Sequence, residues 1–350
     1  MKKYTSMKSK IIVTGGAGYI GSHAIIELLE NTQYEVISID NFSNSQVETY
    51  DRILAITGIS IKHYPIDLCD KQAFFNVLKQ EENVVGLIHF AAFKSVPESV
   101  ANPYKYYHNN IESLLNVLEG ALKFKIHNFI FSSSCSVYGN IKGLPVDENT
   151  PFSKAESPYA QTKQIGESIL NDYAKTYPLL KSISLRYFNP VGAHITGLIG
   201  EYPINRPTSL VPVITQTAIG KLDKMLVHGT DYETRDGSCI RDYIHVSDIA
   251  GAHVKALELL LNTNNGPTTN VYNLGSGNGV SVLEAIHTFE KIAGIPLNYS
   301  IGPRREGDVE AIFSDTTKSF KELNWETRFS LEEMIESAWK WELYLKENLK

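Results

Sequence analysis

The first half of the chain alternates short apolar, β-branched runs with longer stretches in which apolar residues recur at helical spacing. The short runs predict strands over Lys10–Thr14, Glu35–Asp40, Ile61–Tyr64, Val84–Phe90, Asn128–Ser132 and Ser182–Tyr187. The amphipathic stretches between them predict helices over Ser22–Asn31, Lys71–Glu81, Ile111–Lys123 and Tyr159–Tyr177. This alternation is typical of a parallel sheet with helices on both faces, which binds ligands at the carboxyl ends of its strands.

The regular alternation ends at Tyr187, where we place a domain boundary. Residues 188–242 are rich in Pro, Gly and Thr, and only Val213–Lys221 has helical periodicity. Later elements are a helix over Ser247–Leu261, a strand over Asn270–Leu274, a helix from Ser281 and a final helix over Leu331–Asn348. A second, smaller domain made of discontinuous segments is therefore expected.

Composition and charge narrow the class of protein. The 350 residues carry 33 basic and 39 acidic side chains, and this net charge of −6 lacks the broad positive surface typical of a nucleic-acid binder. No apolar run approaches the roughly 18 residues that span a bilayer, and the basic N-terminus has no following small-residue cleavage site. The odd number of distant cysteines indicates reduced thiols and a cytoplasmic location, and no His/Cys spacing predicts a metal site.

A glycine-rich turn follows the first predicted strand and opens the first predicted helix. Gly15, Gly18 and Gly21 recur every three residues, and Gly16 completes the spacing G-x-G-x-x-G. Glycines let the backbone approach a pyrophosphate, and a helix N-terminus offers free N–H groups to it. The alternative is a glycine-rich turn without a ligand.

Acidic residues end the next two strands. Asp40 lies 19 positions beyond Gly21, where a carboxylate accepts hydrogen bonds from the adenosine ribose and repels a 2′-phosphate. Its neighbour Asn41 brings no positive charge, so the pattern favours NAD over NADP. An Asx turn is the alternative for Asp40. Asp67 fits either an adenine contact or a turn.

A tyrosine–lysine pair provides candidate acid–base chemistry. Tyr159 and Lys163 share a helix face, and a cation beside a phenol is expected to lower the pKa of the phenol. The same spacing occurs at three other tyrosines, but only Tyr159 has a helix start before it, with Ser157 as N-cap and Pro158 at the first helical position. Ser134 ends a strand at the expected cofactor edge and is the candidate hydrogen-bond donor to the oxygen that Tyr159 deprotonates; a polar strand end without a role is the alternative.

Together with other motifs in the same order, these features resemble the extended short-chain dehydrogenase/reductase family, and within it most closely the enzymes that invert carbon 4 of a UDP-hexose. The likeness covers nearly the whole chain. It rests on Val13–His23, Asp40–Asn41, Asn44–Ser45, His89–Ala92, Lys94–Val96, Tyr106–Asn110, Phe131–Ser134, Ser136–Gly139, Arg186–His194, Arg241–Val246, Arg304–Asp308 and Leu323–Trp325.

The resemblance implies an α/β fold with a Rossmann-like doubly wound parallel sheet and a second, smaller mixed α/β substrate domain. The NAD-binding domain would comprise residues 1–187 plus about 241–272, and the UDP-sugar-binding domain residues 188–240 plus about 273–350. A homodimer formed through helices around 102–123 and 159–177 is also implied.

The implied reaction is a reversible, redox-neutral inversion at carbon 4 through a 4-keto sugar. Tyr159 would take the proton of the 4-hydroxyl while a tightly held NAD takes the hydride. Ser134 would support the developing oxyanion, and Lys163 would tune Tyr159 and hold the nicotinamide ribose.

The resemblance also assigns contacts. Those to NAD fall on Gly15, Gly18, Tyr19, Ile20, Gly21, Asp40, Asn41, Asn44, Ser45, Asp67, Leu68, Phe90, Ala91, Lys94, Asn109, Ser134, Tyr159, Lys163 and Tyr187. Those to the UDP-sugar fall on Lys94, Ser134, Tyr159, Asn189, Ser209, Leu210, Leu226, Val227, His228, Arg241, Tyr243, Arg305, Asp308 and Ile312. Among them, Arg241 and Arg305 would clamp the diphosphate; a solvated ion pair is the alternative for Arg304 and Arg305.

Two departures from the family pattern bear on the substrate. Ser209 stands where the family carries an asparagine, so an amide contact is lost or replaced. Ile312 matches a position whose bulk admits or excludes N-acetyl sugars, and its intermediate size favours UDP-glucose and UDP-galactose. UDP-N-acetylhexosamines, UDP-uronates and UDP-pentoses remain alternatives, as does a non-catalytic NAD-binding sensor.

Cys135 and Ser136 stand where related dehydratases and decarboxylases need carboxylates, which disfavours those reactions.

Overall fold

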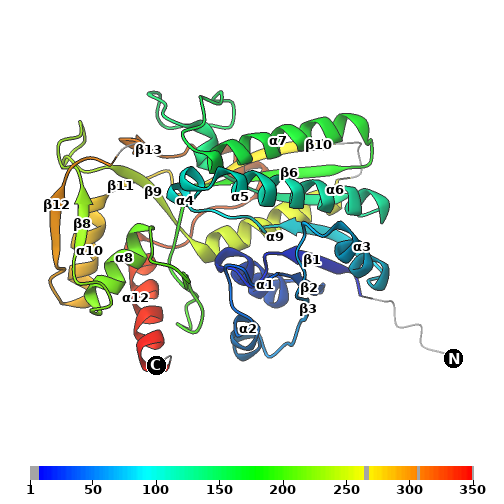
Figure 1. Ribbon diagram of the computed structural model, residues 1–350, viewed down its shortest axis with the longest axis horizontal. Helices are drawn as coiled ribbons and strands as arrows, with labels where there is room; N and C mark the ends of the chain where they lie inside the picture. The colour runs from blue at the N-terminus through cyan, green and yellow to red at the C-terminus, as the bar shows by residue number, and fades with distance from the viewer. Residues whose placement is uncertain (1–7, 264–267, 306–307, 349–350) are drawn as a thin grey trace.

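Seven parallel strands form the main sheet of the computed structural model, which describes residues 8–263, 268–305 and 308–348 (Figure 1). Their order is β10-β6-β5-β4-β1-β2-β3. The strands are β1 (Lys10–Thr14), β2 (Glu35–Ile39), β3 (Lys62–Tyr64), β4 (Val84–His89), β5 (Asn128–Ser134), β6 (Lys181–Tyr187) and β10 (Thr268–Leu274). Because β1 pairs with both β2 and β4, the strand order reverses there, which opens a ligand-binding crevice at the carboxyl ends. The sequence-based expectation of an α/β fold with this kind of sheet is confirmed.

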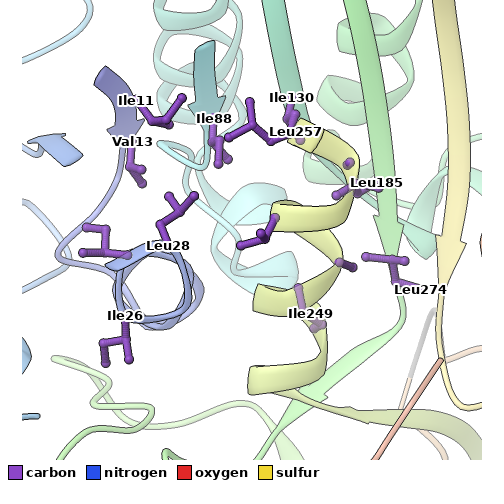
Figure 2. Close-up of a cluster of buried hydrophobic side chains, with 14 of the residues drawn as sticks. Ile11, Val13, Ile26, Leu28, Ile88, Ile130, Leu185, Ile249, Leu257 and Leu274 are labelled. Atoms are coloured by element: carbon purple, nitrogen blue, oxygen red, sulfur yellow. The ribbon is translucent and has the colours of Figure 1, made fainter. Parts of the chain in front are cut away.

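Helices cover both faces of this sheet because successive strand residues point to opposite sides. Ile11 and Val13 of β1 face α1 (Tyr19–Asn31) and α9 (Val246–Asn262), and Figure 2 shows their side chains in one buried cluster with those of both helices. Ile12 lies in the cluster on the other face, with α3 (Lys71–Gln80), α6 (Ser113–Lys123) and α7 (Pro158–Thr176). These two cores fix the strand ends on which the site is built.

The smaller part of the molecule is a mixed sheet with its own helices. Strand β9 pairs with β11, β13 and β7, and β8 pairs with β12 in a separate ribbon. The strands are β7 (Asn189–Val191), β8 (Met225–His228), β9 (Ile240–His245), β11 (Gly279–Ser281), β12 (Tyr299–Gly302) and β13 (Ala311–Ile312). A third buried cluster joins α8 (Leu210–Ala218), α10 (Val282–Ala293) and α12 (Leu331–Asn348) to β8.

The remaining short elements were not expected from the sequence. They are α2 (Thr49–Thr57), α4 (Val96–Ala101), α5 (Pro103–Tyr107), the π-turn His108–Glu112, the 3₁₀ turn Cys135–Tyr138 and α11 (Thr317–Leu323). Residues 188–242 also contain more regular structure than their composition suggested, because β7, β8 and the start of β9 are short strands that pair with distant segments.

The predicted domain limits near 241 and 272 fall inside strands of the two sheets. The limit near 241 falls inside β9, which belongs to the smaller sheet, so the chain re-enters the larger part at Val246. The limit near 272 falls inside β10, which continues to Leu274 in the larger sheet. The N-terminal segment 1–7 and residues Glu306 and Gly307 lie outside the described residues. None of the described helices has the length and hydropathy that crossing a bilayer requires.

Candidate active site

A cavity of about 1400 Å³ lies where the strands of the large sheet end and the smaller part begins. Its lining includes every residue expected to contact cofactor or substrate except Ile312. Many of these residues end a strand or directly follow one, as Gly15 follows β1, Asp40 follows β2 and Phe90 follows β4. The parallel sheet therefore brings together residues that lie far apart in the sequence.

The glycine turn has a geometry that side chains would obstruct. Gly15 has a φ of +69°, and a Cβ there would lie 2.8 Å from the amide nitrogen of Ala91. A Cβ on Gly21 would lie 2.2 Å from the carbonyl oxygen of Gly15. Helix α1 begins at Tyr19 with Gly18 as N-cap and without a side-chain cap. Its first N–H groups lack intrahelical acceptors, so the turn fits the diphosphate of a dinucleotide.

Asp40 forms the Asx turn that was the alternative interpretation of its position. One carboxylate oxygen accepts a hydrogen bond from the Phe42 amide at 2.9 Å, which is an Asx turn, and another from the Ser45 hydroxyl at 2.8 Å. The other oxygen accepts the Ala17 amide of the glycine turn at 3.0 Å. The carboxylate still lines the cavity, where a ribose hydroxyl can reach it. Asn41 donates to Asp67 at 3.1 Å, so this rim is held by side-chain hydrogen bonds.

Helix α7 begins as its sequence predicted. Ser157 accepts a hydrogen bond from the Ala160 amide at 3.2 Å, and Pro158 occupies the first helical position. Tyr159 and Lys163 then point to the carboxyl end of β5. The Lys163 ammonium donates to the Ser132 carbonyl at 2.6 Å and lies 5.9 Å from the centroid of the Tyr159 ring.

Burial controls the ionisation of both side chains. It raises the pKa of Tyr159 to about 12, against an opposing hydrogen bond from Ser134. It lowers the pKa of Lys163 to about 8, against the opposing charge of Glu167. The expectation of a lowered pKa for Tyr159 is wrong for the protein alone, because desolvation of the phenolate outweighs the hydrogen bond from Ser134. Near neutral pH the protonated phenol of Tyr159 is therefore favoured in the protein alone.

Two arginines in the substrate half share one carboxylate. The Asp308 carboxylate accepts a hydrogen bond from Arg305 at 2.6 Å and lies 3.8 Å from the nearest nitrogen of Arg241. The neighbouring Arg304 instead forms an ion pair with Asp231 at 2.9 Å. Only Arg305 of the adjacent arginines lines the cavity, and it can reach an anionic ligand together with Arg241.

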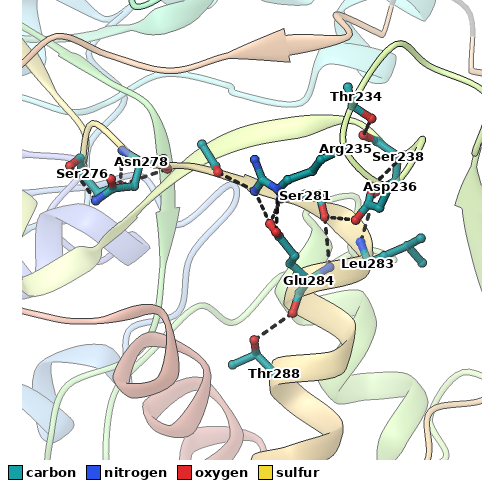
Figure 3. Close-up of polar contacts among 11 residues, drawn as sticks. Thr234, Arg235, Asp236, Ser238, Ser276, Asn278, Ser281, Leu283, Glu284 and Thr288 are labelled. Atoms are coloured by element: carbon teal, nitrogen blue, oxygen red, sulfur yellow. Dashed lines mark hydrogen bonds and ion pairs between the residues drawn. The ribbon is translucent and has the colours of Figure 1, made fainter.

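The loop before β9 is fastened to the N-terminus of α10, as Figure 3 shows. Arg235 donates to Glu284 at 2.5 Å, and Asp236 accepts hydrogen bonds from the hydroxyl groups of Ser281 and Ser238. Ser281 and Glu284 also form a capping box at the start of α10. The network fixes the start of β9, the strand that carries Arg241.

Ile312 does not reach the cavity lining. Its side chain is 6% exposed and packs in an apolar cluster with Val137, Tyr138, Val146 and Phe188. Among the buried residues of this cluster, Phe188 alone also lines the cavity. In this structure the bulk of Ile312 therefore acts on the pocket only through its neighbours.

Sequence reasoning left many lining residues unassigned, among them Arg52, Cys135 and Glu201. Glu201 forms an ion pair with Lys94 at 2.7 Å across the two parts of the molecule. Arg52 lies on the unexpected helix α2, and no local pattern marks Glu201. Cys135 was visible as the neighbour of Ser134, and burial raises the pKa of its thiol to about 12, so it is not a ready nucleophile.

Comparisons with known proteins agree with this arrangement. Residues 11–275 match the model of the NAD dependent epimerase/dehydratase family. A UDP-glucose 4-epimerase of Bacillus subtilis (strain 168) is 46% identical over 95% of this chain and 96% of its own. The structure of the Stenotrophomonas maltophila UDP-glucose 4-epimerase, with NAD and formylated UDP-arabinopyranose, matches with a TM-score of 0.93 at 40% identity, over 97% of this chain and 99% of its own. That of the Bifidobacterium longum enzyme, with NAD⁺ and UDP, gives 0.91 at 43% identity and the same coverage.

Proposed function

The chain belongs to the NAD dependent epimerase/dehydratase family, and we propose that it interconverts UDP-glucose and UDP-galactose by inversion at carbon 4, with NAD as a resident cofactor. One observation carries this proposal. A dinucleotide-type glycine turn, a buried tyrosine–lysine pair and two arginines suited to a diphosphate line a single cavity. That combination matches a reaction in which a nucleotide-sugar is oxidised and reduced without leaving the protein.

The chain's own residues supply proton transfer and orientation. Tyr159 takes the proton of the sugar 4-hydroxyl, while Ser134 donates a hydrogen bond to the same oxygen. Gly15, Gly21 and Asp40 would hold NAD, which when bound would supply the hydride acceptor and donor for carbon 4 and a positive charge that lowers the pKa of a neighbouring phenol. Tyr159 gives its proton back to the 4-oxygen when hydride arrives on the other face of the keto sugar, so protons and electrons balance over one cycle.

Substrate anchoring lies apart from the reacting carbon. Arg241 and Arg305 bind the diphosphate, and Asp308 keeps the two guanidinium groups together. Ser209 is the N-cap of α8, but its side chain makes no capping hydrogen bond. Its hydroxyl can therefore contact the substrate. The hexosyl group can then turn over between oxidation and reduction while its nucleotide stays bound.

Assembly and location are part of the same proposal. We infer a homodimer through the helices around 102–123 and 159–177. Nearby apolar side chains support it, since Val100 on α4 is 61% exposed and Tyr104 on α5 is 75% exposed. All three cysteines are free thiols, which suits a reducing cytoplasm.

The test is direct. The purified protein is incubated with UDP-galactose without added NAD, and UDP-glucose is measured over time. Turnover without added cofactor is expected, because the cofactor remains bound through each cycle. Parallel incubations with UDP-N-acetylglucosamine, UDP-glucuronate and a UDP-pentose define the substrate range. Failure to convert UDP-galactose even after NAD is supplied overturns the proposal and favours a sensor.

A further inference from the structure

Three consecutive serines at the end of strand β5 each interact with a different residue of helix α7. Ser132–Ser134 are consecutive on the strand, while Tyr159, Lys163 and Glu167 follow one another at intervals of four on the helix. The carbonyl of the first serine accepts from Lys163 at 2.6 Å, and the hydroxyl of the second donates to Glu167 at 2.5 Å. The third serine lies beside Tyr159. Ser132, Ser134, Tyr159 and Lys163 line the cavity, whereas the pair of Ser133 and Glu167 does not.

Glu167 is held from its other side by a buried arginine. Arg186 of β6 donates to both carboxylate oxygens, at 2.9 and 2.7 Å, and the side chains of Glu167 and Arg186 are 4% and 5% exposed. A further nitrogen of Arg186 donates to the Tyr138 hydroxyl at 2.9 Å, and Tyr138 donates to Asn273 at 2.6 Å. The network therefore joins α7 to β5, β6 and β10.

None of Ser133, Glu167 and Arg186 lines the cavity. They cannot contact cofactor or substrate, and any effect they have on the reaction must pass through other residues. Replacing a buried ion pair with apolar groups is often neutral or stabilising, so its presence here is not explained by stability alone. Its placement, one residue from Ser134 and one helical turn from Lys163, points to a role in geometry.

We propose that Glu167, held by Ser133 and Arg186, is a positioning residue that fixes the register of α7 against β5 and so keeps Ser134, Tyr159 and Lys163 in reacting geometry. The inference rests on the proposed epimerase function. A bidentate guanidinium–carboxylate pair holds both direction and distance, and displacements of about 1 Å in a reacting group can cost about 100-fold in rate. A shift of α7 along β5 would move Tyr159 and Lys163 together.

The smallest test is Ser133→Ala, which removes one hydroxyl and leaves both charges paired. We expect kcat for UDP-galactose to fall roughly 5- to 10-fold, while KM stays within about twofold because the arginine clamp is untouched. The wild-type protein is assayed in parallel, so a failure of the epimerase proposal shows as absent wild-type turnover and is distinguished from a failure of this inference.

A double variant separates geometry from stability. Glu167→Gln combined with Arg186→Met removes both charges at similar volume, and we expect it to fold with a kcat at least roughly 10-fold lower at unchanged KM. The matched control is Glu81→Gln. Glu81 is an equally buried carboxylate bonded to Lys10 and Tyr64 at the opposite edge of the sheet, and its loss is expected to lower stability without lowering kcat.

The outcomes decide the role of the network. A lower kcat at constant KM in the Ser133 and double variants, absent from Glu81→Gln, supports the proposal. A kcat within twofold of wild type in Ser133→Ala overturns it, as does an equal loss of kcat in Glu81→Gln. If the double variant does not fold, Ser133→Ala decides alone.

Discussion

The two halves of the cavity are held in place by different forces. The dinucleotide half is made of backbone: a glycine turn, a helix N-terminus and the ends of strands in a seven-stranded ladder. The sugar half is made of side chains on loops and short strands, fixed by ion pairs such as those of Asp308 with Arg305 and Arg241. A site formed by backbone is disrupted by an added Cβ but tolerates changes of side-chain charge. A site held by ion pairs is disrupted by changes of charge but tolerates small changes of backbone geometry.

The proposed catalytic side chains lie in the dinucleotide half of the cavity. Ser134 ends a central strand, and Tyr159 and Lys163 occupy the first turns of a helix packed on the same sheet. Substitutions can therefore separate three properties: chemistry, cofactor retention and substrate affinity.

The largest effect is expected from Tyr159→Phe, which removes the base but keeps the ring. The rate of UDP-galactose conversion should fall about 1000-fold, within the range for loss of a general acid–base group. The NAD released on denaturation should remain near the wild-type amount, because the glycine turn is unchanged. Tyr177→Phe at the end of the same helix, 42% exposed, is the control. A loss of less than tenfold removes Tyr159 from the proposed mechanism.

Gly21→Ala tests the backbone half. Its Cβ would lie 2.2 Å from the Gly15 carbonyl oxygen, so the turn must move. We expect the free energy of unfolding to fall by about 1–3 kcal/mol and bound NAD to be lost, measured by urea unfolding and by cofactor content. Gly143→Ala enters open space and serves as the control. Full NAD retention in Gly21→Ala would contradict the assignment of the turn.

The same division explains what the sequence could predict. Strands, helices and the glycine turn of the larger part follow local periodicity, and they appear within a few residues of the expected limits. Short strands such as β7 and β9 are stabilised by pairing with distant segments, which no local pattern records. Glu201 and Ile312 show the same limit at single residues, since their positions depend on packing between the two parts. The pKa of Tyr159 was predicted in the wrong direction because the spacing of Tyr159 and Lys163 does not show how deeply the folded protein buries the phenol.

Asp308→Asn tests the side-chain half. Without the carboxylate, Arg241 and Arg305 lose their shared partner and must be ordered by the substrate itself. We expect KM for UDP-galactose to rise roughly 3- to 10-fold, with NAD content unchanged. Asp231→Asn releases only Arg304, which does not line the cavity, and KM should stay within about twofold. A loss of NAD from Asp308→Asn would show that the two halves are not separable in this way.

The smallest expected effect is on how the free energy of unfolding changes at acidic pH, and it involves buried histidines of the larger part of the molecule. His89 at the end of β4 bonds to the Thr14 hydroxyl at 2.8 Å, and burial lowers its pKa to about 3. Burial likewise lowers the pKa of His23 to about 3 and that of His253 to about 4. An unfolded histidine binds protons from about pH 6.5 downward and these folded ones do not, so each favours unfolding as the pH falls from 6.5 towards its folded pKa.

His89→Gln isolates one such group. Between pH 7 and 6, a histidine that stays neutral only when folded lowers the free energy of unfolding by roughly 0.7 kcal/mol, so the variant should lose that much less than wild type over this interval. Urea unfolding at the two pH values measures the difference, and His287→Gln at an exposed position of α10 should leave it unchanged. An unaltered pH dependence in His89→Gln would mean that His89 takes up as many protons in the folded as in the unfolded chain over this interval, which would contradict a pKa lowered by burial.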